Sequence, residues 1–226
     1  MATSPIVQKL KPILGYWKIR GLAHPVRFLL AYLEVDFEDK YYELTPELTK
    51  DYWFEDRKKL NLEFPNLPYL IDGDFKVTES RAILKYLART RKPDLLGNGL
   101  EVQTRLDTVE NFVYDLWIIN FVEMLYGYTE ERHQKYKELE PLKLAYLSSF
   151  MKDNSWVSGN NITYVDFLVY EILYQLTIFD PNCLDKFNNL KEFMKRFESL
   201  PAINRYINSK DFLNAPLYSK TAIYKI

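Results

Sequence analysis

The hydrophobic pattern of this chain changes part-way along, and that change limits the folds it can adopt. Up to about residue 96, short apolar runs typical of strands alternate with helical stretches. From residue 100 onward, apolar residues recur at helical spacing and strand-like runs are almost absent. We therefore expect a small α/β layer followed by an all-helical region. The stretch Arg91-Lys92-Pro93-Asp94 is the natural linker between them.

The first half predicts the order β-α-β followed by β-β-α. The expected strands cover residues 13–17, 37–43, 68–71 and 75–78, and the expected helices cover residues 24–33 and 80–89. Asp72-Gly73-Asp74 separates the last two strands and is typical of a hairpin turn. These elements would form one small sheet with helices packed on it.

Helical spacing dominates the second half. One helix is marked by Leu106, Val109, Val113 and Leu116, and a second by Leu144, Leu147 and Met151. Thr163 and Asp166 have the spacing of a capping box, in which the two side chains satisfy free backbone amides. A helix is therefore predicted to begin at Tyr164.

Composition excludes several classes of protein. The formal net charge is −1, which argues against strong sequence-independent binding to nucleic acid or anionic lipid. No apolar run approaches the roughly 18 residues that a membrane span needs. The single cysteine forbids an internal disulfide, and two histidines without a cysteine cluster argue against a zinc site. We expect a soluble cytosolic protein whose residues 1–10 form a disordered extension.

The common enzyme motifs are mostly missing. The chain has no GxxxxGK or GxGxxG segment, and it contains only 7 glycines. A Ser-His-Asp triad would need His24 or His133. His24 precedes a proline at a helix start and favours a structural role, whereas His133 lies in a charged stretch and is expected to be solvated. The residues taken alone indicate no obvious nucleophile.

Short segments in order along the chain resemble mu-class glutathione S-transferases. They are residues 12–22, 64–73, 77–83, 163–168 and 183–185, and the similarity covers roughly residues 11–220. The resemblance implies a thioredoxin-like N-terminal domain over residues 11–92 and a helical-bundle domain over residues 98–226. It further implies a cytoplasmic homodimer that takes glutathione as co-substrate and has no prosthetic group or metal, and whose other ligands are small hydrophobic electrophiles.

The resemblance points to Tyr16 as the catalytic residue. Glutathione attacks as a thiolate, and a free thiol has a pKa of about 8.5. A phenol titrates near pH 10, so Tyr16 keeps its proton at neutral pH and can donate it to sulfur. A hydrogen bond to a charged partner contributes roughly 1.5–3 kcal/mol, which lowers the thiol pKa by about one to two units. Glutaredoxin-like chemistry is disfavoured, because tyrosine rather than cysteine holds this position.

Further glutathione contacts follow from the same resemblance. The residues that would bind the tripeptide are Tyr16, Trp17, Leu22, Trp53, Arg57, Asn66, Leu67, Glu79, Ser80 and Asp115. Ser80 begins a helix whose free amides can receive a carboxylate, and Leu67-Pro68 resembles the cis-proline turn of the family. Asp115 would reach glutathione across a dimer interface, and Phe64 would be the aromatic key of that interface.

Some positions depart from the family pattern. Arg57 stands where a lysine is usual, and Glu79 where a glutamine is usual. Asn61 replaces a common glycine and is expected to keep a left-handed backbone conformation. The segment from Leu44 to Tyr52 is about two residues shorter than its family counterpart.

The family's variable electrophile pocket corresponds to apolar and aromatic positions. They are Ile19, Tyr114, Ile118, Phe121, Leu125, Tyr126 and Tyr218, with Trp117 nearby. Such residues suit planar hydrophobic acceptors, but those on the helix are equally compatible with a bundle core. Tyr126 stands one place beyond the position where the family often has a tyrosine that assists addition to epoxides or enones.

The expected function is glutathione conjugation to hydrophobic electrophiles. A ligandin that binds apolar compounds, a structural crystallin-like relative, and an isomerase or prostaglandin-forming enzyme remain alternatives. Retention of Tyr16, Trp17, Trp53, Asn66 and Ser80 argues against the structural relative.

Overall fold

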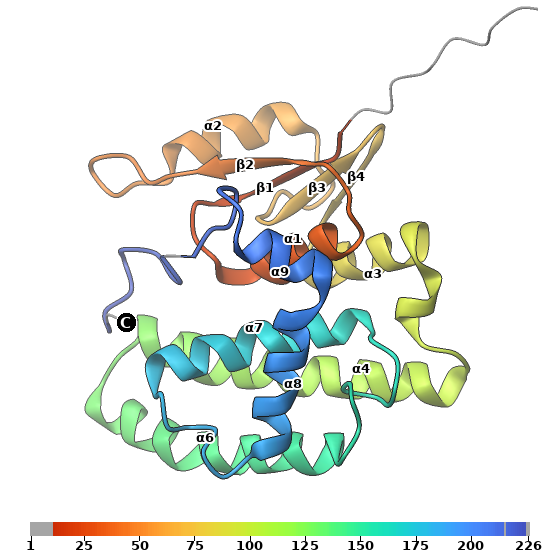
Figure 1. Cartoon of the computed structure of the whole chain (residues 1–226). Helices are drawn as coiled ribbons and strands as arrows, with labels where there is room; N and C mark the ends of the chain where they lie inside the picture. The colour runs from red at the N-terminus through yellow and green to blue at the C-terminus, as the bar shows by residue number, and fades with distance from the viewer. Residues whose placement is uncertain (1–10, 215, 225–226) are drawn as a thin grey trace, which may run out of the picture.

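A computed structural model describes residues 11–214 and 216–224. The expected N-terminal extension, residues 1–10, lies outside these described residues. The described chain forms two layers, with a small sheet and its helices above a larger group of helices in Figure 1. The α/β layer followed by a helical region, expected from the change in hydrophobic pattern, is confirmed.

Four strands form a mixed sheet in the order β2-β1-β3-β4. Their bounds are Ile13–Trp17 for β1, Glu38–Tyr42 for β2, Tyr69–Asp72 for β3 and Phe75–Thr78 for β4. The central strand β1 runs parallel to β2 and antiparallel to β3. Gly15 is required at its centre, because a Cβ there would lie 2.2 Å from the ring of Tyr69 on β3. The predicted β3–β4 hairpin is confirmed.

Helices cover both faces of this sheet. On one face lies α2 (Asp51–Leu60), and on the other lie α1 (His24–Tyr32) and α3 (Ser80–Arg91), as Figure 1 shows. Both α1 and α3 match the predicted helices. Helix α2 was not predicted, because most of its residues are charged or polar and Trp53 is its one buried residue. Asn61 ends α2 at φ +49°, so the expected left-handed conformation is confirmed.

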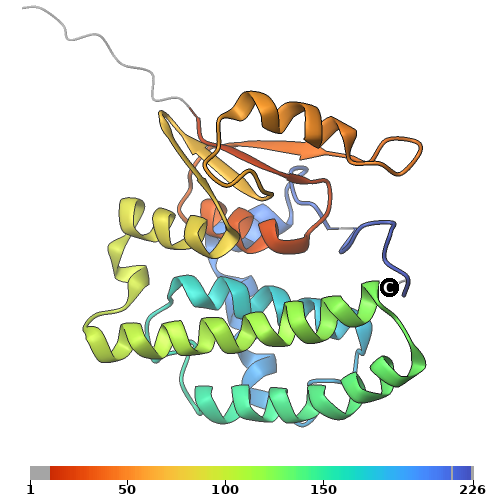
Figure 2. The ribbon, with the colours of Figure 1, turned by 180° about the vertical axis from the view of Figure 1, so that it is seen from behind.

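The second layer contains the remaining helices. After a short 3-10 turn (Pro93–Leu96) come α4 (Leu100–Tyr114), the π-helical segment Asp115–Val122 and α5 (Glu123–Tyr126), then α6 (Glu130–Met151), α7 (Tyr164–Phe179), α8 (Asn188–Ser199) and α9 (Pro201–Ile207). Seen from behind in Figure 2, α4, the π segment and α5 run on as one long helix. The capping box predicted at Thr163 and Asp166 is confirmed at the start of α7.

One hydrophobic core joins the two layers. Helix α7 lies at its centre, is buried along most of its length and packs against α1 and α4. His24, at the start of α1, is fully buried against Phe28, as a structural role requires. His133 is partly buried rather than solvated, because aromatic rings, among them Tyr224, pack around it. Among the described helices, none is long and apolar enough to cross a membrane.

Candidate active site

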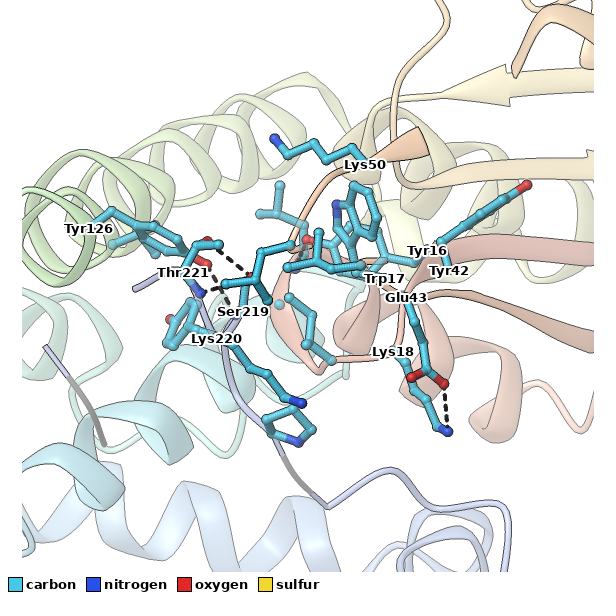
Figure 3. Close-up of a pocket in the computed structure, with 18 of the residues that line it drawn as sticks. Tyr16, Trp17, Lys18, Tyr42, Glu43, Lys50, Tyr126, Ser219, Lys220 and Thr221 are labelled. Atoms are coloured by element: carbon cyan, nitrogen blue, oxygen red, sulfur yellow. Dashed lines mark hydrogen bonds and ion pairs between the residues drawn. The ribbon is translucent and has the colours of Figure 1, made fainter. Parts of the chain in front are cut away.

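A cavity of about 700 Å³ opens where the edge of the sheet meets the long helix. One wall is the end of β1 and the turn after it, and a second is the segment of residues 43–50 that follows β2. The opposite wall comes from the π segment and α5 together with residues 216–221 of the C-terminal segment. In Figure 3, Tyr126 and residues 219–221 face Tyr16 and Trp17 across this space.

Tyr16 lies on the cavity wall at the end of β1. The amide of Leu22, in the 3-10 turn Gly21–Ala23, donates to the Tyr16 hydroxyl oxygen at 3.1 Å. Burial raises the pKa of Tyr16 to about 12, and the side chain is 6% exposed. Among the described residues, no acceptor takes the phenol proton. Tyr16 is therefore a neutral hydroxyl with its oxygen fixed and its proton available.

The turn beneath Tyr16 fits closely around it. Gly21 has φ +39°, and a Cβ there would lie 2.7 Å from the Tyr16 hydroxyl oxygen. The amides of Arg20 and Gly21 donate to the carbonyl oxygens of Pro216 and Leu217, at 2.9 and 3.1 Å. The same short segment thus positions Tyr16 and holds the C-terminal segment beside it.

Tyr126 presents a second hydroxyl to the cavity from the opposite wall. The amide of Ser219 donates to its oxygen at 3.1 Å, and burial raises the pKa of Tyr126. No acceptor for its proton lies among the residues that the structure describes. The cavity therefore has two neutral phenol donors, Tyr16 and Tyr126, on facing walls.

Tyr218 differs from these two tyrosines, because its hydroxyl is already engaged. It donates to the side-chain oxygen of Gln175, which also accepts from the indole nitrogen of Trp117 at 2.9 Å. Gln175 is fully buried on α7. The polar end of Tyr218 is thus held by the core, and the rest of its side chain forms part of the cavity wall.

The structure brings together some of the expected pocket residues and separates others. Of the residues expected in the electrophile pocket, those that line the cavity are Ile19, Ile118, Tyr126 and Tyr218, and the nearby Trp117 lines it as well. Three expected glutathione contacts also line it, namely Tyr16, Trp17 and Leu22. Phe121 and Leu125 do not line it, because both are fully buried in the helical core. Tyr114 also lies outside the lining, with the guanidinium of Arg81 stacked 4.2 Å from its ring centre.

Sequence reasoning missed one wall of the cavity. Within the segment of residues 43–50, the lining includes the apolar side chains Leu44, Pro46 and Leu48 and the basic side chain Lys50. Lys18 and Lys220 also line the cavity, as does Val122 of the π segment. The shorter segment between residues 44 and 52 was the signal that could have directed attention to this wall.

A second group of expected residues lies at the same end of the sheet. Gly15 pairs with Tyr69, so the next residues along the two strands, Tyr16 and Pro68, meet at this edge. The Leu67-Pro68 peptide is cis, as expected. Ser80 is buried at the first position of α3, where its backbone amide has no partner within the helix.

The other expected glutathione contacts come from several elements. Asn66 donates its side-chain amide to Glu79 at 3.0 Å. On α2, Trp53 is buried and stacks on Tyr69, whereas Arg57 is exposed with its guanidinium over a phenylalanine ring. Asp115 is exposed, and Phe64, expected as the key of the dimer interface, is 75% exposed.

Comparison with known proteins identifies this arrangement. Residues 12–89 match the family model described as glutathione S-transferase, N-terminal domain, and residues 116–210 match its C-terminal domain. The chain belongs to the glutathione S-transferase family. It is 46% identical over 213 residues to glutathione S-transferase Mu 2 of Mus musculus, covering 93% of this chain and 97% of that protein. It is 45% identical over 214 residues to glutathione S-transferase Mu 1 of Homo sapiens, covering 94% and 97%.

Solved structures agree with this assignment. The pi-class glutathione S-transferase of Onchocerca volvulus aligns with a TM-score of 0.82 at 30% identity, over 94% of this chain and 100% of that one. The glutathione S-transferase Blo t 8 aligns with a TM-score of 0.84 at 35% identity, over 93% and 98%. The expected mu-class resemblance and the thioredoxin-like layer followed by a helical region are confirmed. As a member of this family, the chain is a transferase that takes glutathione as its substrate.

Proposed function

We propose that this chain joins the glutathione thiolate to hydrophobic electrophiles, with Tyr16 as the hydrogen-bond donor to sulfur. The observation that carries the proposal is the state of the Tyr16 hydroxyl. Its oxygen accepts the Leu22 amide at 3.1 Å, and its proton has no acceptor among the described residues. The hydroxyl faces an apolar-walled cavity large enough for a small aromatic or aliphatic acceptor.

The energetics favour a neutral donor at this position. Because burial raises the pKa of Tyr16 to about 12, the phenol stays protonated throughout the physiological pH range. A hydrogen bond to an ionised partner contributes roughly 1.5–3 kcal/mol. That lowers the pKa of the bound thiol by about one to two units, from about 8.5 to near neutrality. The thiolate is then a major species at pH 7.

Glutathione would lie along the cis-proline turn, on the domain of residues 11–92. Leu67 would offer its backbone to the cysteinyl unit, and the start of α3 at Ser80 would receive the γ-glutamyl carboxylate. The remaining contacts would come from Trp17, Leu22, Trp53, Arg57, Asn66 and Glu79. Asn66 already donates to Glu79 in the structure, so this pair would present one combined polar surface to the ligand.

The electrophile would lie against the domain of residues 98–226. Tyr126 is well placed to assist acceptors that develop negative charge on oxygen, such as enones and epoxides. Its phenol proton is available, and its oxygen is held by Ser219. Ile19, Ile118 and the ring of Tyr218 would form the apolar surface beneath the acceptor. Phe121 and Leu125 would support that surface from the core.

A homodimer in the cytoplasm completes the proposal. The exposed ring of Phe64 would insert into the helical domain of a second copy. Asp115, exposed near the start of the π segment, would reach the ammonium of glutathione bound to that second copy. No prosthetic group is required for this chemistry, because glutathione itself supplies the nucleophile.

Replacing Tyr16 with phenylalanine tests the proposal. Y16F should lower kcat/KM for a chlorodinitrobenzene acceptor by one to two orders of magnitude. The ultraviolet absorbance of bound thiolate should titrate about one to two pH units higher, because the donor to sulfur is gone. The matched control is Y146F, since Tyr146 is 56% exposed on α6 and does not line the cavity.

Two results would contradict the assignment. One is near-wild-type turnover by Y16F, and the other is a thiol that stays protonated well above neutrality in the wild-type complex. Retention of the wild-type protein on immobilised glutathione without any turnover would instead favour a ligandin. That alternative shares the cavity but does not need the Tyr16 proton.

A further inference from the structure

Helix α2 carries two of the expected glutathione contacts, Trp53 and Arg57, yet it has little apolar surface with which to pack on the sheet. Trp53 is its one buried residue, and the neighbouring Phe54 is 38% exposed. A helix with so narrow an apolar stripe needs further contacts to fix its position on the layer beneath it. In Figure 1 it lies on the face of the sheet opposite α1 and α3. The contacts that attach it there therefore decide where Trp53 and Arg57 stand.

Asp56 supplies a second attachment of this helix. Its Oδ2 atom accepts from the Lys40 ammonium at 2.6 Å and from the Tyr42 hydroxyl at 2.5 Å. Both donors belong to β2 and stand two residues apart, so their side chains leave the same face of the sheet. The hydrogen bonds from Lys40 and Tyr42 hold the pKa of Asp56 below its usual range, so the carboxylate is ionised at neutral pH. Asp56 thus binds α2 to β2 through two charge-assisted hydrogen bonds.

The same cluster continues into the expected glutathione site. The Tyr42 hydroxyl oxygen lies 2.9 Å from that of Tyr69, and the Trp53 ring stacks on the Tyr69 ring with 6.1 Å between their centres. Trp53 also meets the Tyr42 ring edge-on at 5.3 Å. Asp56 follows Trp53 by three residues, so both side chains leave α2 on the side that faces the sheet. One aromatic and one ionic attachment therefore fix both the position and the rotation of the helix.

The side chain of Arg57 depends on that rotation. It is next to Asp56 in the sequence and exposed, and its guanidinium lies 4.5 Å from the centre of the Phe54 ring on the same helix. Among the described residues, no hydrogen bond or ion pair engages this guanidinium. Its direction is thus set by how α2 is seated on the sheet.

Building on the proposed function, we propose that Asp56 is a positioning residue for glutathione. By fixing α2 on β2 it places Trp53 and Arg57 against the bound tripeptide, and so it sets the affinity for glutathione. Asp56 itself does not line the cavity that contains Tyr16. Because the Tyr16 hydroxyl is anchored separately, by the Leu22 amide, ionisation of the bound sulfur should not depend on Asp56.

The test measures the Kd for glutathione by calorimetry in D56A, D56N and K40M. D56A removes the acceptor, so α2 is correctly placed in only a fraction of the molecules, and Kd should rise by about fivefold to thirtyfold. At saturating glutathione, kcat should stay within about twofold of wild type, and the bound thiol should titrate at the wild-type pH. D56N keeps an acceptor oxygen in a side chain of the same shape and should recover most of the lost affinity. K40M removes one of the two donors and should raise Kd by about threefold.

E55A is the matched control, because Glu55 neighbours Asp56 on α2 but forms its ion pair with Lys58 of the same helix. The inference is overturned if D56A binds glutathione as tightly as E55A does or, should D56A fail to fold, if K40M does. It is also overturned if D56N binds no better than D56A, or if kcat and the pH of thiol ionisation change together with Kd, because Asp56 would then act at the sulfur. A wild-type protein that binds glutathione without turnover would contradict the proposed function alone, since the effect of Asp56 on Kd would still be measured.

Discussion

The two hydroxyls of the cavity are held in the same way. Tyr16 accepts the amide of Leu22, and Tyr126 accepts the amide of Ser219, each at 3.1 Å. A hydroxyl whose oxygen is engaged by a backbone donor can turn its own proton only toward the remaining space, which here is the cavity. Both residues would act as donors without reorganising when charge develops on sulfur or oxygen.

Gly21 tests how closely Tyr16 must be placed. In G21A the new Cβ would lie 2.7 Å from the Tyr16 hydroxyl oxygen, at a position with φ +39°. We expect kcat/KM to fall at least tenfold, because displacing a catalytic group by about 1 Å is enough for such a loss. The unfolding free energy should fall by only about 1–2 kcal/mol, from the left-handed backbone.

G73A is the matched control for that experiment. Gly73 also has positive φ, at +64°, but a Cβ there meets nothing within 4 Å. It should therefore carry the backbone strain alone and leave turnover intact. Equal losses of activity in G21A and G73A would show that close contact with Tyr16 does not matter.

Among the elements, the π segment explains how Tyr126 reaches the cavity. The resemblance places Tyr126 one residue beyond the family tyrosine, which in a regular α-helix would turn it by about 100°. The i→i+5 bonding of residues 115–122 holds one more residue than the α-helical turn it replaces. If Tyr126 does stand one residue further along, the π segment would absorb the extra residue; in the structure Leu125 stays in the core and Tyr126 lines the cavity.

Deleting Ile119 should consequently be tolerated. Ile119 is 51% exposed within the π segment, and its removal would let the helix become regular without moving either flank. We expect the melting temperature to stay within about 5 °C of wild type or to rise. The rate of enone conjugation should remain within about threefold of wild type. Y126F should lower that rate by the same factor in the deletion variant as in the full-length chain.

Deletion of Thr108, in the regular helix α4, provides the contrast. It would turn the buried positions on one side of the gap, such as Leu106, away from those on the other. Circular dichroism melts and turnover should both show severe losses. If the two deletions were equally damaging, the π segment would not be accommodating an extra residue.

At the scale of the whole molecule, a buried ion pair joins the two layers. Arg20, just after β1, pairs with Glu171 of α7 through contacts of 2.5 and 3.0 Å, and both side chains are fully buried. Gln175 donates to the same carboxylate at 2.7 Å and continues the chain of contacts to Tyr218. The orientation of the sheet relative to the helical layer is thereby linked to the wall of the cavity.

E171Q should be strongly destabilising, because it leaves the Arg20 charge buried without a counter-charge. We expect a loss of about 3–5 kcal/mol in the free energy of unfolding, measured by urea titration. Combining R20M with E171L should recover most of that loss, since an apolar pair needs no desolvation of charge. In the cycle formed by R20M, E171L and their combination, additive effects would mean that the pair does not couple the layers.

Local signals account for the part of the fold that could be predicted. The capping box at Thr163 fixes the start of α7, and the Asp72-Gly73-Asp74 turn fixes the hairpin, because both depend on neighbours within a few residues. Helix α2 carried no comparable apolar signal, since Trp53 alone is buried there. The π segment could not be predicted either, because its residues have the same apolar spacing as an α-helix and the i→i+5 bonding depends on the folded backbone.

The sequence by itself determined the family and the order of an α/β layer followed by a helical region, and it proposed Tyr16 as the donor, because these depend on motifs that remain contiguous in the chain. Only the tertiary structure decided which residues of the long helix face the cavity, sending Phe121 to the core and Tyr126 to the lining. It also brought Lys50 and Lys220 into the lining of one cavity, across 170 residues of chain. Side-chain direction depends on the rotation of a helix against its neighbours, and that rotation is set by packing between segments distant in the sequence.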